Sequence, residues 1–147
     1  MARLLGIARR AQKRAVMEIL DAVEVTVESG VAGDFRGKPG KRQVTLMSRE
    51  AWQAACNDLG EDLPWTTRRA NLLVEGLALD DTAGKQIKIG DLTLEITRET
   101  DPCERMDEAR QGLLSAMTKD WRGGVCCRVI SSGKITVGDK VEIIDAE

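Results

Sequence analysis

The chain has 147 residues, with 22 basic and 24 acidic side chains and a formal net charge of −2. A chain of this length can bury one sizeable core without disulfides or a structural metal, so a single domain is expected over residues 1–147. The near balance of charge creates no overall field toward nucleic acid or an anionic membrane, and neither is expected as a partner.

Four cysteines and no histidine are present. No two cysteines are spaced as Cys-x-x-Cys, so the sequence excludes zinc sites of the cysteine/histidine type and histidine-based catalytic triads. The first fourteen residues are basic, but glycine and arginine interrupt their apolar run. Because a secretory signal needs roughly seven or more consecutive apolar residues, we expect a cytoplasmic protein with reduced thiols and no transmembrane segment.

Short strands are predicted in the first part of the chain. Leu4–Ala8 is a plausible strand, and the alternating run Val23–Val27 is a clearer one. The basic segment between them is either a solvated loop or a loop that contacts an anion. Residues 30–43 contain four glycines, one proline and four basic residues, which predicts a long loop whose backbone can approach another group closely.

A strand and a helix follow this loop. Gln43–Met47 is predicted as a strand, and Ser48 can cap a helix that ends at Gly60. Cys56 lies next to the apolar face of this helix and is interpreted as a packing residue. A basic loop then leads into the short buried strand Leu72–Val74.

Two segments in the second half resemble each other. Residues 87–96 and 135–144 each place Gly-Asp between two strand-like runs, which is typical of a tight hairpin. Between them, residues 106–117 have apolar side chains at helical spacing. The sequence therefore predicts a mainly β (α+β) fold of seven or eight strands with about two flanking helices, closed or nearly closed into a barrel.

The segment Thr93–Met106 reads as a strand that ends at Pro102-Cys103. Proline cannot donate to a sheet ladder, so it ends the strand and places the Cys103 thiol at the mouth of the sheet. Neighbouring arginines would lower the pKa of this thiol, whereas Asp101 and Glu104 would raise it. From the residues alone, Cys103 is either a structural cysteine or a functional one.

Two arginine-bearing segments are candidates for anion recognition. Arg122 precedes two glycines, and this combination of a guanidinium with an unobstructed backbone suits a phosphate or carboxylate. The vicinal Cys126 and Cys127 lie in a strand and must point to opposite faces, so at least one belongs to the core. Residues 68–71 form another basic element, for which a solvated loop is the alternative.

Taken in order, five segments resemble the MOSC domain, the family named for the C-terminal part of molybdenum cofactor sulfurase. The similarity extends from about Val23 to Ile144 and suggests a small, stand-alone bacterial-type member. The segments that carry it are GVAGDFRG, RQVTLMSRE, RRANLLVEG, IKIGDLTLEITRETDPCERMDEARQGL and RGGVCCRVISSGKITVGDKVEI.

This resemblance implies a role with the molybdenum cofactor (molybdopterin). Cys103 matches the cysteine that supplies the thiolate to molybdenum and would be both the metal ligand and the catalytic residue. Arg69 and Asn71 match the family's Arg-x-Asn and would help to hold the pterin and phosphate. Arg122 and Gly123 fall on the arginine and the first of the paired glycines, and Arg36 lies in the Gly-Asp loop as a further anion-binding residue.

The chain also departs from the family. Many small members have a histidine in the Gly-Asp loop, where this chain has Arg36, which cannot act as a base near neutral pH. The N-terminal domain of the amidoxime-reducing proteins and the pyridoxal-phosphate domain of the full sulfurase are both missing. Pyridoxal phosphate is therefore not expected, and a redox partner or a sulfur-donor protein is expected instead.

Three functions follow from this reading. The preferred one is binding of the molybdenum cofactor through Cys103, in reduction of small N-hydroxylated compounds or in cofactor sulfur transfer. The second is a metal-free sulfur carrier that holds a persulfide. The third is a non-catalytic module that recognises an anionic partner with Arg36, Arg69 and Arg122.

Overall fold

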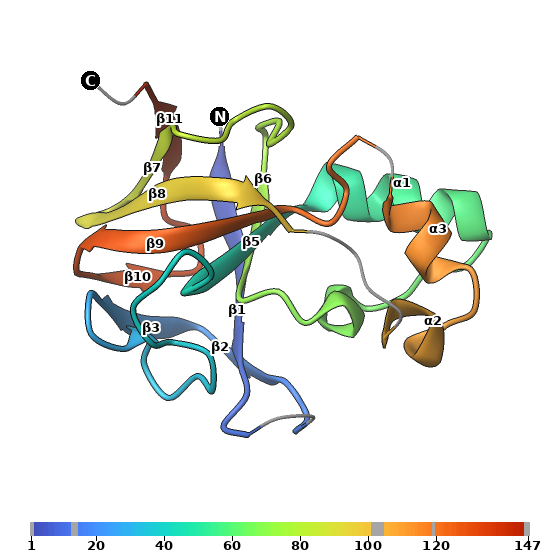
Figure 1. Cartoon of the computed structure of the whole chain (residues 1–147), viewed down its shortest axis with the longest axis horizontal. Helices are drawn as coiled ribbons and strands as arrows, with labels where there is room; N and C mark the ends of the chain where they lie inside the picture. Colours follow the sequence, from blue (N-terminus) through green and yellow to red (C-terminus); the bar gives the residue numbers. More distant parts are fainter. Residues whose placement is uncertain (1, 13–14, 101–104, 119, 146–147) are drawn as a thin grey trace.

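The structure is a computed structural model that describes residues 2–12, 15–100, 105–118 and 120–145. Strands dominate it, as the sequence predicts, and the short helices gather at one end of the molecule (Figure 1). The strands are β1 (Arg3–Arg9), β2 (Glu18–Leu20), β3 (Ala22–Thr26), β4 (Gly30–Val31), β5 (Val44–Ser48), β6 (Leu72–Glu75), β7 (Gln86–Ile89), β8 (Leu92–Glu99), β9 (Val125–Ser131), β10 (Gly133–Thr136) and β11 (Val141–Ile144). The helices are α1 (Arg49–Leu59), the 3₁₀ helix η1 (Trp65–Arg68), α2 (Arg105–Ala109) and α3 (Leu113–Met117).

The described strands form two sheets. The larger has eight strands in the order β11-β7-β8-β9-β5-β6-β1-β2, and the smaller has three in the order β10-β3-β4. The larger sheet is mixed, because β5 and β6 run parallel while their other neighbours run antiparallel. Its two edges, β11 and β2, do not pair with each other.

No sheet is closed among these strands, so the closed barrel predicted from the sequence is not supported. The start of β1 does reach the turn before β11, through an isolated bridge between Arg3 and Lys140 and a 2.8 Å bond from the amide of Leu4 to the carbonyl of Asp139. The contact does not extend into a ladder. β1 pairs with β6 on both sides of a register shift between Leu4 and Gly6, and its last residues also pair with β2.

Only one of the two predicted Gly-Asp hairpins is present in the structure. β7 and β8 pair with each other, as a hairpin should. β10 and β11 do not pair, because β10 joins β3 in the small sheet and β11 joins β7 in the large one. The second predicted hairpin is therefore wrong. The turn at Gly138 instead carries the chain from one sheet to the other.

The first helix follows its sequence signals. The hydroxyl of Ser48 accepts a 3.0 Å hydrogen bond from the amide of Ala51, and Gly60 ends α1 in the left-handed conformation. The second predicted helix is divided into α2 and α3. Gly112, with φ of 91°, lies between them, and the carboxylate of Asp107 accepts hydrogen bonds from the amides of Gly112 and Leu114. No helix among the described residues is long and apolar enough to cross a membrane.

Two apolar clusters hold the fold together. The first is built from strands of both sheets and includes Leu46, Leu94 and Cys127. The second joins the helices to β5 and β6 of the large sheet and includes Trp52 and Leu113. Each buried aliphatic or aromatic side chain of this size contributes about 1.5–3 kcal/mol relative to an exposed one.

A close approach of β9 to β5 depends on Gly124, which precedes β9. Its φ is 86°, and a Cβ placed on it would lie 2.2 Å from the carbonyl oxygen of Leu46. Gly60 has a similar φ of 70°, but a Cβ there would meet nothing within 4 Å. A substitution at Gly124 would therefore cause both backbone strain and a steric collision, whereas one at Gly60 would cause backbone strain alone.

We predict that Gly124→Ala lowers the free energy of unfolding by at least about 3 kcal/mol, because left-handed strain is added to a collision with β5. Gly60→Ala should cost only about 1–2 kcal/mol, the cost of the left-handed conformation alone. Urea titrations followed by tryptophan fluorescence would compare the two variants. Equal losses would show that the contact with Leu46 does not constrain the fold.

Candidate functional site

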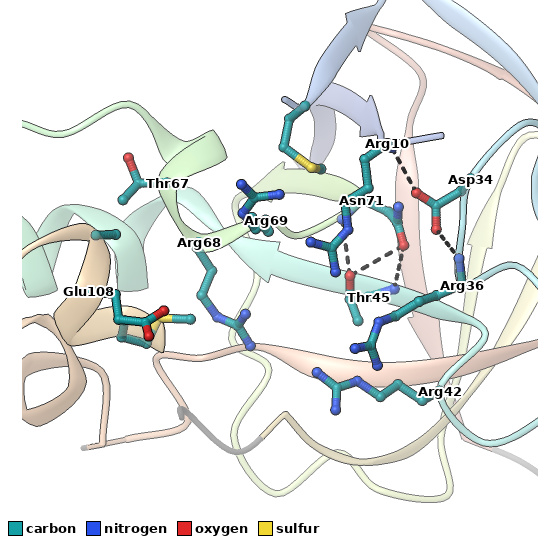
Figure 2. A pocket seen from close by; sticks show the side chains of 13 residues that line it. Arg10, Asp34, Arg36, Arg42, Thr45, Thr67, Arg68, Arg69, Asn71 and Glu108 are labelled. Atoms are coloured by element: carbon teal, nitrogen blue, oxygen red, sulfur yellow. Dashed lines mark hydrogen bonds between the residues drawn. The ribbon is translucent and has the colours of Figure 1, made fainter. Parts of the chain in front are cut away.

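A pocket of about 400 Å³ opens where the helical end of the molecule meets the sheet (Figure 2). Its walls come from the end of β1, the loop that contains Gly33-Asp34, the start of β5, the junction of η1 with β6, and α2. A volume of this size lies within the range of small-molecule and cofactor sites.

Arginine is the dominant residue of the pocket. Five arginines line it, against two acidic side chains, Asp34 and Glu108. Figure 2 shows the side chains of Arg36 and Arg42 extending from one wall toward those of Arg10 and Arg68 on the others. The arginines are Arg10, Arg36, Arg42, Arg68 and Arg69.

Asp34 holds the backbone of two of these arginines. One carboxylate oxygen accepts a 3.0 Å hydrogen bond from the amide of Arg10, and the other accepts a 3.1 Å bond from the amide of Arg36. Arg9 also anchors this loop, because its guanidinium donates to the carbonyl of Ala32 at 2.6 Å. Because both carboxylate oxygens of Asp34 accept from amides, this residue orders the loop and brings two arginines to the pocket.

Asn71 joins three strands at the floor of the pocket. Its side-chain oxygen accepts from the amide of Thr45 at 3.1 Å, and its side-chain nitrogen donates to the carbonyl of Ala8 at 3.1 Å. Its backbone amide donates to the hydroxyl and the carbonyl of Thr45, both at 3.0 Å. Only 5% of Asn71 is exposed. Its position in the pocket is therefore fixed by the pairing of β5 with β6 and by the end of β1.

Two further arginines are placed by the short 3₁₀ helix. Arg68 is the last residue of η1 and is 6% exposed. Arg69 follows with φ of 65°, a left-handed conformation that is uncommon for a residue other than glycine, and its guanidinium donates to the carbonyl of Ala15 at 2.7 Å. The change of direction at Arg69 lets two adjacent arginines line the same pocket while Asn71 returns to the sheet.

The site residues predicted from the sequence differ in whether they line the pocket. Arg36, Arg69 and Asn71 all line the pocket. Arg122 and Gly123 do not line it. The guanidinium of Arg122 donates to the carboxylate of Asp58 and to the carbonyl of Ala116, so it fastens the end of α1 to α3.

Cys103, the predicted thiolate ligand, lies outside the residues that the structure describes. The other three cysteines are free and buried. Cys126 lies opposite Thr45 in the β5–β9 pairing, and its sulfur is 3.4 Å from the hydroxyl of Thr100. Cys127 instead packs in the core between the sheets, where burial and then the neighbouring Cys126 raise the pKa of its thiol.

Arg10, Arg42 and Arg68 line the pocket but were not singled out as site residues by the sequence. The signals were present, since Arg10 belongs to the basic segment for which contact with an anion was one of two interpretations. Arg42 belongs to the glycine-rich loop and Arg68 to the basic element before β6. Only the fold shows that all three face one cavity.

Guanidinium groups at this density suit a ligand with phosphate or carboxylate oxygens, because each can donate two parallel hydrogen bonds. Among the described residues, no group of three or more histidine, cysteine, aspartate or glutamate side chains is placed to hold a metal ion.

We predict that Asn71→Ala lowers the free energy of unfolding by about 2–4 kcal/mol, since it leaves buried partners on β1 and β5 unsatisfied. Arg36→Gln should change it by no more than about 0.5 kcal/mol, because the Arg36 side chain is exposed and makes no hydrogen bond with another described residue. Thermal and urea unfolding would test both. A small effect of Asn71→Ala would show that the three-strand junction does not depend on this side chain.

The raised pKa of Cys127 also gives a prediction. Its thiol should stay protonated and unreactive toward iodoacetamide at about pH 8 in the native protein, and should react once denaturant unfolds the chain. Above about pH 8.5 the unfolded chain releases this proton first, so the free energy of unfolding should fall as the pH rises. Peptide mass spectrometry would measure the labelling. Rapid native labelling of Cys127 would contradict the burial of this thiol.

Solved structures share this fold. The YuaD protein from Bacillus subtilis superposes with a TM-score of 0.84 at 22% identity, over 100% of this chain and 98% of that chain. YiiM from Geobacillus stearothermophilus gives 0.80 at 16% identity, over 99% and 76%, and YiiM from Escherichia coli gives 0.74 at 17% identity, over 99% and 71%. At these identities the likeness shows the fold alone.

Among curated proteins, none matches the chain significantly. The family comparison is positive, because residues 29–142 match the model of the MOSC domain. This range includes every residue that lines the pocket except Arg10 and Met17, and it includes strands β5 to β10. The chain belongs to the MOSC domain family.

Proposed function

We propose that this protein binds the molybdenum cofactor in the arginine-lined pocket and acts in reduction of small N-hydroxylated compounds or in cofactor sulfur transfer. The observation that carries the proposal is the convergence of five arginines on one cavity that also contains Asn71. The family is associated with this cofactor, which supports the choice of ligand.

The chemistry of the pocket fits the organic part of the cofactor. Arg36, Arg42 and Arg68 would bind the phosphate, because guanidinium groups match phosphate oxygens in pairs. Met17 and Met106 also line the pocket and supply apolar, adaptable surface for a flat ring. The cofactor would bring molybdenum with its own sulfur ligands, and a cysteine thiolate is a suitable additional donor for such a soft site.

Cys103 remains the proposed thiolate. It follows β8, whose last residue, Glu99, pairs with Val125 at the start of β9. Cys126 lies next to this position and faces the same side of the sheet as Thr45, which lines the pocket. The free thiols of the described cysteines suit a reducing compartment such as the cytoplasm.

The test is to express the protein in a host that makes the cofactor and to measure bound molybdenum, pterin and phosphate. Arg36→Gln should weaken binding roughly 10- to 100-fold, the effect of losing charge-assisted hydrogen bonds. Arg128→Gln is the matched control, because Arg128 is exposed on β9, pairs with Glu95 and does not line the pocket.

Cys103→Ser separates the role of the thiol from that of the arginines. It should lower the molybdenum content while pterin and phosphate are retained. Equal, negligible molybdenum in the wild type and in Cys103→Ser would overturn the proposal.

A second candidate is a non-catalytic module that binds an anionic partner. The arginine cluster favours it, because the five guanidinium groups attract an anion with or without a thiol. In that case Arg36→Gln would abolish binding of the anion while Cys103→Ser would have no effect on any bound group.

A metal-free sulfur carrier would instead gain the mass of one sulfur on Cys103 after exposure to a cysteine desulfurase, and reductant would remove it.

A further inference from the structure

We propose that the loop of residues 36–42 is a docking surface for an acidic electron-carrier protein. This surface, the basic rim, consists of Arg36, Lys38, Lys41 and Arg42. The loop has seven residues, of which these four are cationic and none is acidic, in a chain whose net charge is −2. The inference rests on the proposed function, because only a cofactor that changes its oxidation state needs an electron carrier.

The basic rim differs from other cationic surface of the described chain. Elsewhere, exposed cations commonly pair with carboxylates, as in Arg49 with Glu75, Arg128 with Glu95 and Lys140 with Glu142. The side chains of the basic rim make no hydrogen bond or ion pair with another described residue. All four residues are exposed. Their charge is therefore available to a partner, and it would be concentrated enough to steer an anionic one.

The backbone under these charges is held in place. The side-chain nitrogen of Gln43, which is 2% exposed, donates to the carbonyl of Gly37 at 3.0 Å and to that of Val27 at 2.7 Å. The hydroxyl of Thr97 donates to the carbonyl of Lys41 at 2.5 Å. A loop fixed at both ends presents its cations with little ordering cost on binding.

The position of the four cations distinguishes a large partner from a small ligand. Arg36 and Arg42 line the pocket, but Lys38 and Lys41 do not. A small anion inside the pocket would meet only the two arginines. The two lysines are exposed outside the lining, so a macromolecule covering the pocket mouth would be able to reach them.

An exposed aromatic side chain adjoins the basic rim. Phe35 is the only phenylalanine of the chain and is 42% exposed, with the guanidinium of Arg10 at 6.0 Å from its ring centroid. Aromatic and arginine side chains contribute most of the binding energy at many protein interfaces. Phe35 beside the cations therefore resembles a small interface with an apolar contact and a charged margin.

An acidic protein fits this surface better than a nucleic acid. Nucleic-acid binding depends on many phosphate contacts and, for single strands, on aromatic stacking surfaces. Here the basic rim has four cations and adjoins one exposed aromatic ring, that of Phe35, while Trp52 is buried against the sheet. Small interfaces driven by complementary charge are typical of transient electron-transfer complexes.

The test uses a plant-type [2Fe–2S] ferredoxin as the acidic probe. Its affinity for the full chain, prepared with its cofactor, would be measured by calorimetry at low salt and again at about 0.15 M salt, where surface charges are screened. Lys38→Glu and Lys41→Glu should each weaken binding at least about threefold, and together about tenfold or more. The matched control is Lys134→Glu on β10, which makes the same charge change on an exposed lysine outside the basic rim.

Each result has one meaning. Loss of ferredoxin binding in the two rim variants but not in Lys134→Glu supports the proposal. No measurable binding by the wild type, or equal loss in all three variants, overturns it. If a short single-stranded DNA binds more tightly than ferredoxin and through the same lysines, the surface binds nucleic acid and the proposal is wrong.

Molybdenum and pterin content would be measured in the same preparations. Lys38 and Lys41 do not line the pocket, so the rim variants should retain the wild-type content. Normal cofactor content without ferredoxin binding would therefore overturn only the docking proposal. Ferredoxin binding without cofactor in any preparation would overturn the proposed function instead.

Discussion

The pocket depends on the parallel pairing of β5 with β6, which Asn71 and Thr45 join side by side. Asn71 and Thr45 exchange backbone and side-chain hydrogen bonds, and Asn71 also binds the carbonyl of Ala8 on β1. Since η1 ends only three residues before Asn71, the same contact fixes where the arginines of η1 and its cap lie. The buried side-chain amide of Asn71 thus holds the neighbouring strands together and also positions the arginines that give the pocket its charge.

Without a ligand, repulsion between the guanidinium groups of the arginine cluster costs free energy. With an anionic ligand, the same groups would contribute to binding. Like charges gathered in a concave site repel one another, and here the two acidic residues of the lining do not balance the five guanidinium groups. Asp34 accepts from the amides of Arg10 and Arg36, so it brings the arginines close through their backbone. An anion that fills the pocket would relieve this repulsion.

The sequence predicts local features well and distant pairings poorly. The cap at Ser48 and the left-handed end at Gly60 depend on neighbouring residues, so they could be identified directly. The turn at Gly138 has the same local signal as a hairpin, but its flanking strands find better partners in two different sheets. The contact of Arg122 with Asp58 is likewise distant in the sequence, since the two residues are 64 positions apart and no local pattern points to it.

The resemblance to a family identified Arg36, Arg69 and Asn71 as candidate site residues, and in the fold all three line one pocket. It did not distinguish their tasks. Asn71 is buried and its side chain joins strands, whereas Arg36 is exposed and faces the cavity. Asn71 shapes the floor of the site, and the guanidinium groups around it are the groups chemically suited to contact an anion.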